Sequence, residues 1–318
     1  MARSDSESPD SGARPPLLAV VGPTSVGKTA LAVSLAARLD GEIVNADSRQ
    51  VYRGMEIGTA QPSIAERSRV PHHLFSFVDP EDPFSLALYL DLARRTIGEI
   101  VGRDALPILV GGSGLYVRAI LSGMVPPRVE PDLAFRNALE GRAAVEGAQA
   151  LHSELMRADP VAAAAIDPRN VRRTIRALEV IRATGRPFSD QAPSQPPPYD
   201  TIRVGLTLER EVLYQRIDRR VEAMFATGLL EEAARLRDRG LDPALPALSS
   251  LGYREAFSVL GGALSVDLAI EQIKRQTRRF ARQQYTWFQL DDQAIAWFDA
   301  DRPDLLDSVL AYLAERRT

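Results

Sequence analysis

The sequence contains no cysteine and only two lysines, and each shortage limits what this chain can do. Without cysteine there is no disulfide, no thiolate metal site and no cysteine nucleophile, which fits a cytoplasmic protein. No apolar run approaches the roughly 18 residues that a membrane-spanning helix needs, so we expect a soluble protein that does not bind membranes. Residues 1–16 are polar and lack the apolar core of a secretion signal, so we expect a disordered tail there.

Positive charge is carried almost entirely by arginine and is unevenly distributed. The formal net charge is −3, which by itself argues against nucleic-acid binding. Residues 169–186, however, contain six arginines and a single acid, Glu179, and residues 274–282 contain Lys274 and four arginines without any acid. Two basic segments on a slightly acidic chain indicate a polyanion that is held at defined places. The other lysine, Lys28, belongs to a glycine-rich motif.

That motif lies between an expected strand and an expected helix. An apolar run over 17–21 precedes it, an alanine- and leucine-rich segment over 30–39 follows it, and the motif reads Gly22-Pro23-Thr24-Ser25-Val26-Gly27-Lys28-Thr29. This context is typical of a phosphate-binding P-loop, whose backbone N–H groups converge on an anion at the positive end of a helix. Lys28 would add a point charge, and the Thr29 hydroxyl would hold Mg²⁺. The motif predicts binding of a diphosphate or triphosphate, the alternative being a chance glycine turn.

Asp47 follows the apolar segment 42–46, which predicts a second parallel strand. The carboxyl end of such a strand is where open α/β sheets place their sites. Asp47 could be an acidic ligand of Mg²⁺ in phosphoryl transfer, a general base, or a structural residue whose carboxylate caps the next segment. Spacing leaves all three open. A long loop is expected over 49–83, and its adjacent histidines, His72 and His73, are a poor metal pair because neighbouring residues rarely face one ligand site.

The remaining pattern favours an α/β fold with a helical insertion. Helices are expected over 84–101, 210–227, 229–239 and 266–290, and strands over 106–110 and 201–206. A glycine-rich turn over 111–114 contains Ser113, which could cap a helix or contact a ligand. We predict a P-loop NTPase-like parallel sheet flanked by helices over 17–126 and 200–318. Residues 127–199, bounded by prolines, would form an inserted all-helical domain.

Several longer segments are more distinctive than the P-loop. They are Asp47-Ser48-Arg49-Gln50-Val51-Tyr52, Gly54-Met55-Glu56-Ile57-Gly58-Thr59-Ala60, Pro71-His72-His73-Leu74, Gly111-Gly112-Ser113-Gly114-Leu115-Tyr116, Arg176-Ala177-Leu178-Glu179-Val180 and Gly252-Tyr253-Arg254-Glu255. In this order, and together with the P-loop, they resemble the tRNA dimethylallyltransferases, also called isopentenyltransferases. The resemblance runs from about residue 17 to residue 288.

The resemblance implies a reaction and its participants. A dimethylallyl group would pass from dimethylallyl diphosphate to N6 of the adenosine at position 37, beside the anticodon, in tRNAs that read codons beginning with U. The P-loop would hold the diphosphate leaving group, with Mg²⁺ on Thr29. Asp47 would take a proton from the amine, Thr24 would contact the amine or a phosphate, and Arg220 would face the diphosphate, with Arg216 as its rival.

The resemblance also implies a set of residues that contact the anticodon stem-loop. They are Asp47, Ser48, Arg49, Gln50, Ser113, Arg136, Arg172, Arg173, Thr174, Ile175, Arg176, Ser249, Ser250, Leu251, Gly252, Tyr253 and Arg254. Two departures concern the grip on RNA: Gln283 and Gln289 stand where arginine is common, and Arg172 replaces a frequent glutamine. A P-loop kinase and a non-catalytic RNA-binding switch are the alternatives, and we expect a monomer.

Overall fold

The computed structural model describes residues 14–191 and 196–316, and the chain divides into two compact units. One unit combines the chain up to Leu121 with the chain from Pro197 onward, and the other is Ser122–Pro196. Most of the predicted tail, and Pro193 near the end of the predicted insertion, lie outside the described residues. Strand β1 (Pro16–Val21) begins inside the predicted tail. Proline is tolerated as the first residue of a strand, where its missing N–H breaks no ladder hydrogen bond.

The first unit is built on a six-stranded sheet with the order β3-β2-β4-β1-β5-β6. All the paired neighbours are parallel. The other strands are β2 (Gly41–Asn45), β3 (His72–His73), β4 (Leu106–Val110), β5 (Asp200–Thr207) and β6 (Ala296–Asp299). Because β1 lies between β4 and β5, its run 17–21 is buried throughout, as expected for a central parallel strand. The predicted α/β class with a parallel sheet is confirmed.

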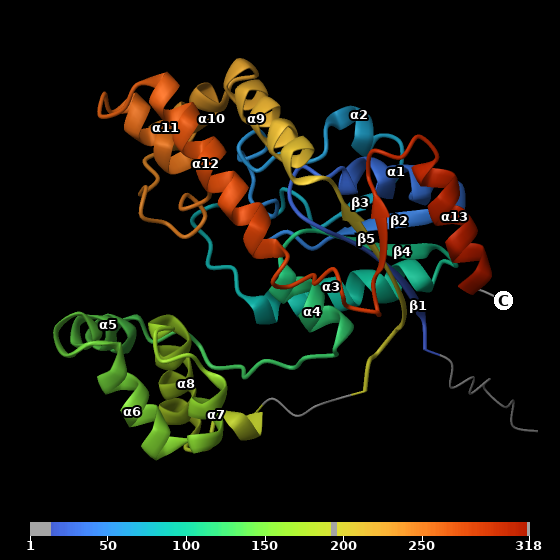
Figure 1. The fold of residues 1–318 in the computed structure, drawn as a ribbon. Helices are drawn as coiled ribbons and strands as arrows, with labels where there is room; N and C mark the ends of the chain where they lie inside the picture. Colours follow the sequence, from blue (N-terminus) through green and yellow to red (C-terminus); the bar gives the residue numbers. More distant parts are fainter. Residues whose placement is uncertain (1–13, 192–195, 317–318) are drawn as a thin grey trace, which may run out of the picture. The chain divides into compact units, whose positions relative to one another are not determined.

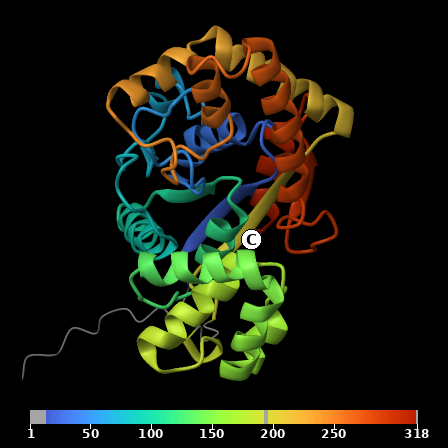
Figure 2. The ribbon, with the colours of Figure 1, turned by 90° about the vertical axis from the view of Figure 1, so that its left-hand side faces the viewer.

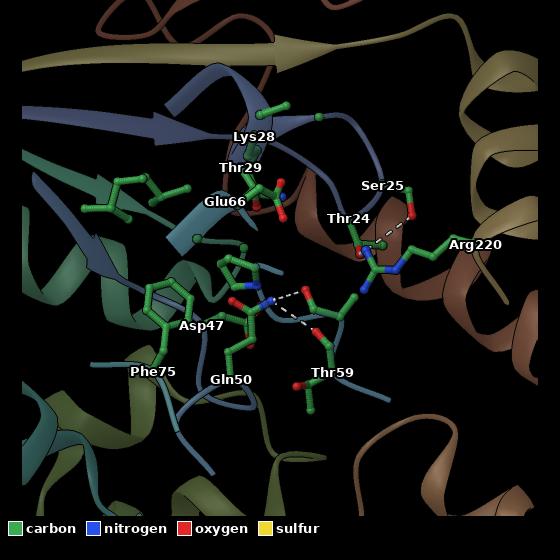
Figure 3. Close-up of a pocket in the computed structure, with 18 of the residues that line it drawn as sticks. Thr24, Ser25, Lys28, Thr29, Asp47, Gln50, Thr59, Glu66, Phe75 and Arg220 are labelled. Carbon is green, nitrogen blue, oxygen red and sulfur yellow. Dashed lines mark hydrogen bonds between the residues drawn. The ribbon is translucent and has the colours of Figure 1, made fainter. Parts of the chain in front are cut away.

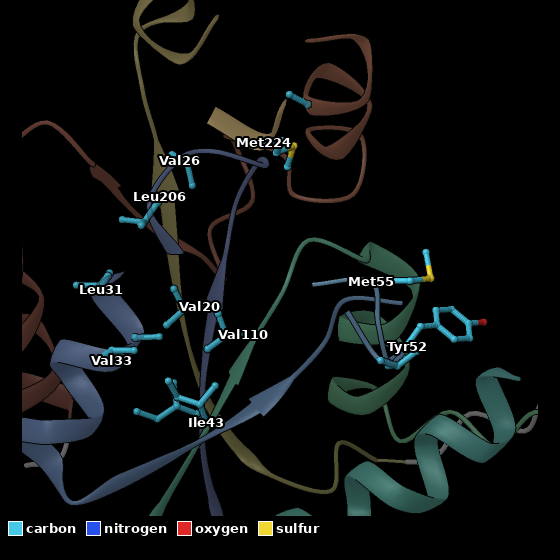
Figure 4. Packing of buried hydrophobic residues seen from close by; sticks show 14 of the residues in the cluster. Val20, Val26, Leu31, Val33, Ile43, Tyr52, Met55, Val110, Leu206 and Met224 are labelled. Atoms are coloured by element: carbon cyan, nitrogen blue, oxygen red, sulfur yellow. The ribbon is translucent and has the colours of Figure 1, made fainter. Parts of the chain in front are cut away.

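Helices cover both faces of this sheet (Figure 1). Helix α1 (Lys28–Leu39) contacts β2 and β4 and also α13 (Leu305–Arg316), while α3 (Leu86–Val101) contacts the same two strands and α4 (Gly114–Leu121). Figure 4 shows Val20, Ile43 and Val110 of the sheet packed with residues of α1. Within the described residues, no helix is both long and apolar enough to cross a membrane.

The first unit also contains α9 (Arg210–Ala226), α10 (Leu229–Asp238), α11 (Tyr253–Leu260) and α12 (Val266–Gln284). The prediction that the last of these runs to residue 290 is wrong: α12 ends at Gln284, and the N–H groups of Tyr285, Thr286 and Trp287 each donate to the carbonyl three residues earlier, as in a turn. The expected loop over 49–83 also contains a short helix, α2 (Ile64–Arg67), and strand β3. Such short elements contain too few residues to show the regular spacing of apolar residues from which helices and strands are predicted.

The second unit is a helical bundle (Figure 2). It contains α5 (Leu133–Glu146), α6 (Ala148–Ala158), α7 (Pro160–Ala165), α8 (Val171–Thr184) and a 3₁₀ turn, η1 (Ser189–Gln191). Leu139, Leu151, Leu155 and Ile175 belong to its apolar core. The break after α7 falls at Ile166, which takes an extended conformation.

Candidate active site

The P-loop takes a conformation that depends on its two glycines. Gly22 and Gly27 have φ angles of 137° and 107°, which residues with a Cβ rarely adopt. A Cβ on Gly22 would also lie 2.4 Å from the Leu206 carbonyl oxygen of β5. Gly27 precedes the first residue of α1, so the loop leads directly into the positive end of that helix. The local sequence thus folds into an anion site.

Two cations face the cavity beside this loop (Figure 3). The Lys28 ammonium group donates to the Pro23 carbonyl at 2.7 Å, and Arg220 of α9 donates to the Thr24 hydroxyl at 3.0 Å. Burial lowers the pKa of Lys28 to about 8, with Asp47 opposing and Arg220 adding to the change. Burial also lowers the pKa of Arg220, again opposed by Asp47. Both pKa shifts have burial as their main cause, so the two cations lie in a part of the cavity that is shielded from water.

Arg216, one helical turn before Arg220, points elsewhere. Its guanidinium group pairs with Asp301 and donates to the Val26 carbonyl, and it does not line the cavity. The acids that could have neutralised Arg220 on its own helix have other partners: Asp218 pairs with Arg278 and Glu222 pairs with Lys274. The charge of Arg220 is therefore not neutralised by an acid of its own helix and remains available to a ligand in the cavity.

Two cavities meet at the P-loop. The smaller one, about 280 Å³, is lined by Thr24, Lys28, Thr29 and the opposing loop residues. The larger one, about 720 Å³, extends over α4, α9 and α12 and is lined more by apolar atoms. The residues that line both are Thr24, Asp47, Thr59, Gly112, Arg220 and Gln284. A polar chamber beside the phosphate loop thus opens into a wider chamber, with Asp47 at the junction.

Asp47 is positioned by a residue that sequence reasoning missed. Asn45, fully buried at the end of β2, accepts from the Asp47 N–H and donates to the Asp47 and Leu74 carbonyls. Tyr89 of α3 donates to the Asn45 carbonyl. Oδ1 of Asp47 accepts from the Arg49 N–H, while Oδ2 has no partner among the described residues. A polar residue ending an apolar run was the available signal for Asn45.

The residues after Asp47 form the opposite wall. The Ser48 N–H donates to the Ser113 hydroxyl, so this hydroxyl contacts a neighbouring loop. Arg49 donates to the Pro246 carbonyl. The Gln50 amide donates to the carbonyls of Thr59 and Ala60 (Figure 3). These contacts bring the segments around 47–50, 59–60 and 111–114 together in one site.

The segment 249–254 is only partly available to a ligand. Ser249, Ser250 and Leu251 line the larger cavity, and Arg254 is exposed. Tyr253, by contrast, is 0 % exposed and donates to buried Glu232. The ring and hydroxyl of Tyr253 are therefore enclosed in the core, and the expected contact of this residue with RNA stays a prediction.

In the helical unit, four of the six predicted contact residues are either paired with an acid or buried. Arg136 and Arg176 both pair with buried Glu179, and these arginines help to lower its pKa to about 2 against the effect of burial. Thr174 and Ile175 are buried, so their side chains cannot meet RNA. Arg172 and Arg173 are exposed and have no acidic partner among the described residues.

The basic residues of segment 274–282 also fall into two groups, those paired with acids and those exposed without an ion pair in the described residues. Lys274 and Arg278 are paired with acids of α9. The others, Arg275, Arg279 and Arg282, are exposed without an ion pair in the described parts of the chain, and their spacing places them on one face of α12. This leaves one free basic face for a polyanion.

The donor set fits a magnesium ion that arrives with a diphosphate. Within the described ranges, no group of three or more histidine or acidic residues could hold a metal by itself. The smaller cavity nevertheless has oxygen atoms from Thr29, Asp47 and Glu66. Because Mg²⁺ usually keeps several waters and shares phosphate oxygens, one or two protein ligands are sufficient.

A parallel sheet, a P-loop and a cation-lined cavity at the carboxyl ends of the strands define a P-loop protein with a diphosphate or triphosphate site. Comparison with known sequences identifies it further. The family described as IPP transferase matches residues 50–291, and the isopentenyl transferase family matches residues 15–71. A tRNA dimethylallyltransferase from Roseiflexus sp. (strain RS-1) is 55% identical over 86% of this chain and 90% of its own length.

Solved structures agree with the sequence comparison. The tRNA isopentenylpyrophosphate transferase of Bacillus halodurans has a TM-score of 0.70 and 44% identity, covering 94% of this chain and 95% of its own. A eukaryotic dimethylallyltransferase described as acting on tRNA has a TM-score of 0.78 and 26% identity, covering 94% of this chain and 77% of its own. The chain belongs to the IPP transferase family, and the kinase and binding-switch alternatives are set aside.

Proposed function

We propose that this protein transfers the dimethylallyl group of dimethylallyl diphosphate to N6 of the adenosine at position 37 of tRNA, in tRNAs that read codons beginning with U. The observation that supports this most is the position of Asp47 at the junction of the two cavities. A diphosphate in the smaller cavity and a purine in the larger one would meet beside its carboxylate. The relatives are themselves described as dimethylallyltransferases that act on tRNA, which supports the same substrates.

The proposed mechanism follows from what the residues offer. As the allylic C–O bond breaks, negative charge grows on the diphosphate, and Lys28, Arg220 and the loop N–H groups stabilise that charge. Thr29 is the residue placed to hold Mg²⁺, which would supply further positive charge to the leaving group. Asp47 takes a proton from the exocyclic amine as the new C–N bond forms, because that amine is a weak nucleophile.

The adenosine must leave its stack to reach this site. Enzymes that act on a base extrude it into a pocket and hold the strand on either side. The larger cavity offers Ser48, Ser113 and Ser249 as polar groups, and Phe280 and Trp287 as exposed aromatic surfaces on which bases can stack. We propose that the exposed arginines on α8 and α12 bind the RNA backbone. We also propose that the protein acts as a monomer.

The test is transfer of labelled dimethylallyl to unmodified tRNA. Asp47→Asn keeps the shape of the side chain and removes the base, so we expect transfer to fall about 10²- to 10⁴-fold while tRNA binding is kept. Arg220→Gln should lower transfer about 10²- to 10³-fold. Arg219→Gln is the matched control, because Arg219 is exposed beside Arg220 on α9, donates to the Gln215 carbonyl of its own helix and lines neither cavity; its loss should stay within about fivefold. Wild-type transfer by the Asp47 variant contradicts the proposal.

A further inference from the structure

The last residue of α12 carries a buried amide that joins two loops of the site. Gln284 is 3 % exposed. Its Oε1 accepts from the Thr24 N–H at 2.7 Å, and its Nε2 donates to the Gly112 carbonyl at 2.9 Å. Because a backbone N–H can only donate and a carbonyl can only accept, the two contacts fix which way the amide faces. A carboxylate or an apolar side chain cannot satisfy both.

The glycine-rich turn is shaped around this end of α12. A Cβ on Gly112 would lie 2.2 Å from the Gln284 amide nitrogen, and a Cβ on Gly114 would lie 2.2 Å from the Trp287 ring. A Cβ on Gly111 would meet the Ala46 carbonyl oxygen at 2.1 Å. The glycines of this turn therefore leave room for neighbouring protein atoms, and the turn packs closely against Gln284 and Trp287.

Thr24 is anchored from two sides. Its N–H is held by Gln284, and its hydroxyl accepts from the Arg220 guanidinium group. A displacement of Thr24 would thus change where Arg220 points. All three residues line both cavities, so the amide lies at the point where the diphosphate and the acceptor base would meet.

We propose that Gln284 is a positioning residue, which acts through Thr24 to aim Arg220 at the diphosphate. The inference rests on the proposed transfer reaction. Gln284 holds Thr24 and the Gly112 turn at fixed places before substrate binds, so that the positive charge needs no rearrangement when the allylic bond breaks. Such preorganisation acts mainly on the transition state and therefore on kcat.

The first experiment is Gln284→Met, which keeps the length of the side chain and removes both hydrogen bonds. We expect kcat to fall about 10- to 100-fold, as small displacements of catalytic groups do, with the KM for tRNA unchanged. Gln293→Met is the matched control, since Gln293 is exposed and, among the described residues, its amide hydrogen-bonds only to the nearby Asp291 carbonyl. An unchanged kcat in Gln284→Met overturns the inference.

A double-mutant cycle separates positioning from a general loss of structure. If Gln284 acts through Arg220, adding Gln284→Met to Arg220→Gln should cost much less in kcat than it does in the wild-type background. Fully additive losses would show that the two residues act independently, and would reject the inference. Thermal unfolding of each variant shows that the assay temperature lies below its transition.

Two measurements do not depend on transfer. Hydrogen exchange at the Thr24 amide of the unaltered protein should be protected, and exchange at the rate of an open loop would contradict the inference even if Gln284→Met does not fold. The affinity for inorganic diphosphate should fall in Gln284→Met and stay unchanged in Gln293→Met. If the wild type fails to transfer but both of these results hold, the proposed function fails and the positioning role of Gln284 remains.

Discussion

Lys28 is the residue whose charge should set the pH range of substrate binding. Its pKa is lowered from 10.5 to about 8, chiefly by burial. Because only the protonated form attracts a diphosphate, the dissociation constant of dimethylallyl diphosphate, measured without tRNA by calorimetry, should rise above pH 8. We expect a slope approaching about tenfold per pH unit, following the loss of the protonated form.

The control is Lys28→Arg, whose guanidinium group stays charged over this range. Its affinity should be flat between pH 7 and pH 9.5, whatever its absolute value. Unfolding cannot mimic the wild-type effect, because a depressed lysine pKa means that the unfolded chain binds more protons between about 8 and 10.5. In that window the Lys28 contribution makes the free protein more stable as pH rises. A flat wild-type profile contradicts the assignment of the charge to Lys28.

Among the elements, α10 and α11 fix the loop that carries the motif 54–60. Glu232 of α10 accepts from the N–H groups of Ile57 and Gly58 and from the Tyr253 hydroxyl of α11. A Cβ on Gly58 would lie 2.5 Å from the Tyr253 ring. This explains why glycine stands at 58: the tyrosine of a distant motif occupies that space, and the next residue, Thr59, is thereby held against both cavities.

Tyr253→Phe should therefore destabilise the protein without touching the chemistry. The variant removes one donor to a buried carboxylate, and we expect the free energy of unfolding to fall by about 1–3 kcal/mol, measured by urea denaturation. Tyr312→Phe is the matched control, because the Tyr312 hydroxyl has no hydrogen bond among the described residues; its change should stay within about 0.5 kcal/mol. Equal free energies of unfolding for the two variants would show that the hydrogen bond from Tyr253 to Glu232 does not stabilise the fold.

The elements also show what the sequence could predict. The run 17–21, the P-loop and α1 were predictable because a buried parallel strand, two glycines and a helical period are local signals. The end of an apolar strand marked Asp47 as a site candidate, whereas its expected role and the choice of Arg220 came from the resemblance to a family. Gln284 was not, since nothing local distinguishes it from Gln283, and only the fold brings it within hydrogen-bonding distance of Thr24. The partners of Arg136 and Arg176 were likewise hidden, because Glu179 meets them through tertiary packing.

For the whole molecule, the net charge of −3 and the binding of a polyanion are compatible because the charge is sorted by position. The acids of α9 and α8 neutralise part of each basic segment, while Arg275, Arg279 and Arg282 stay exposed on α12. If these three contact phosphates, each should contribute to the salt dependence of tRNA binding through the release of counterions. Binding of tRNA would then depend less on the net charge of the chain than on the exposed arginines of α12.

The prediction is that changing Arg275, Arg279 and Arg282 together to glutamine reduces the slope of log K against log[salt] by about 2 to 3. Arg38, Arg69 and Arg95, changed together, are the control: they are exposed, they line neither cavity, and their loss lowers the net charge equally. Filter binding across a salt series measures both. Because screening acts within about 10 Å at 0.1 M salt, an effect of overall charge would shift the two variants alike, and that outcome would remove α12 from the RNA interface.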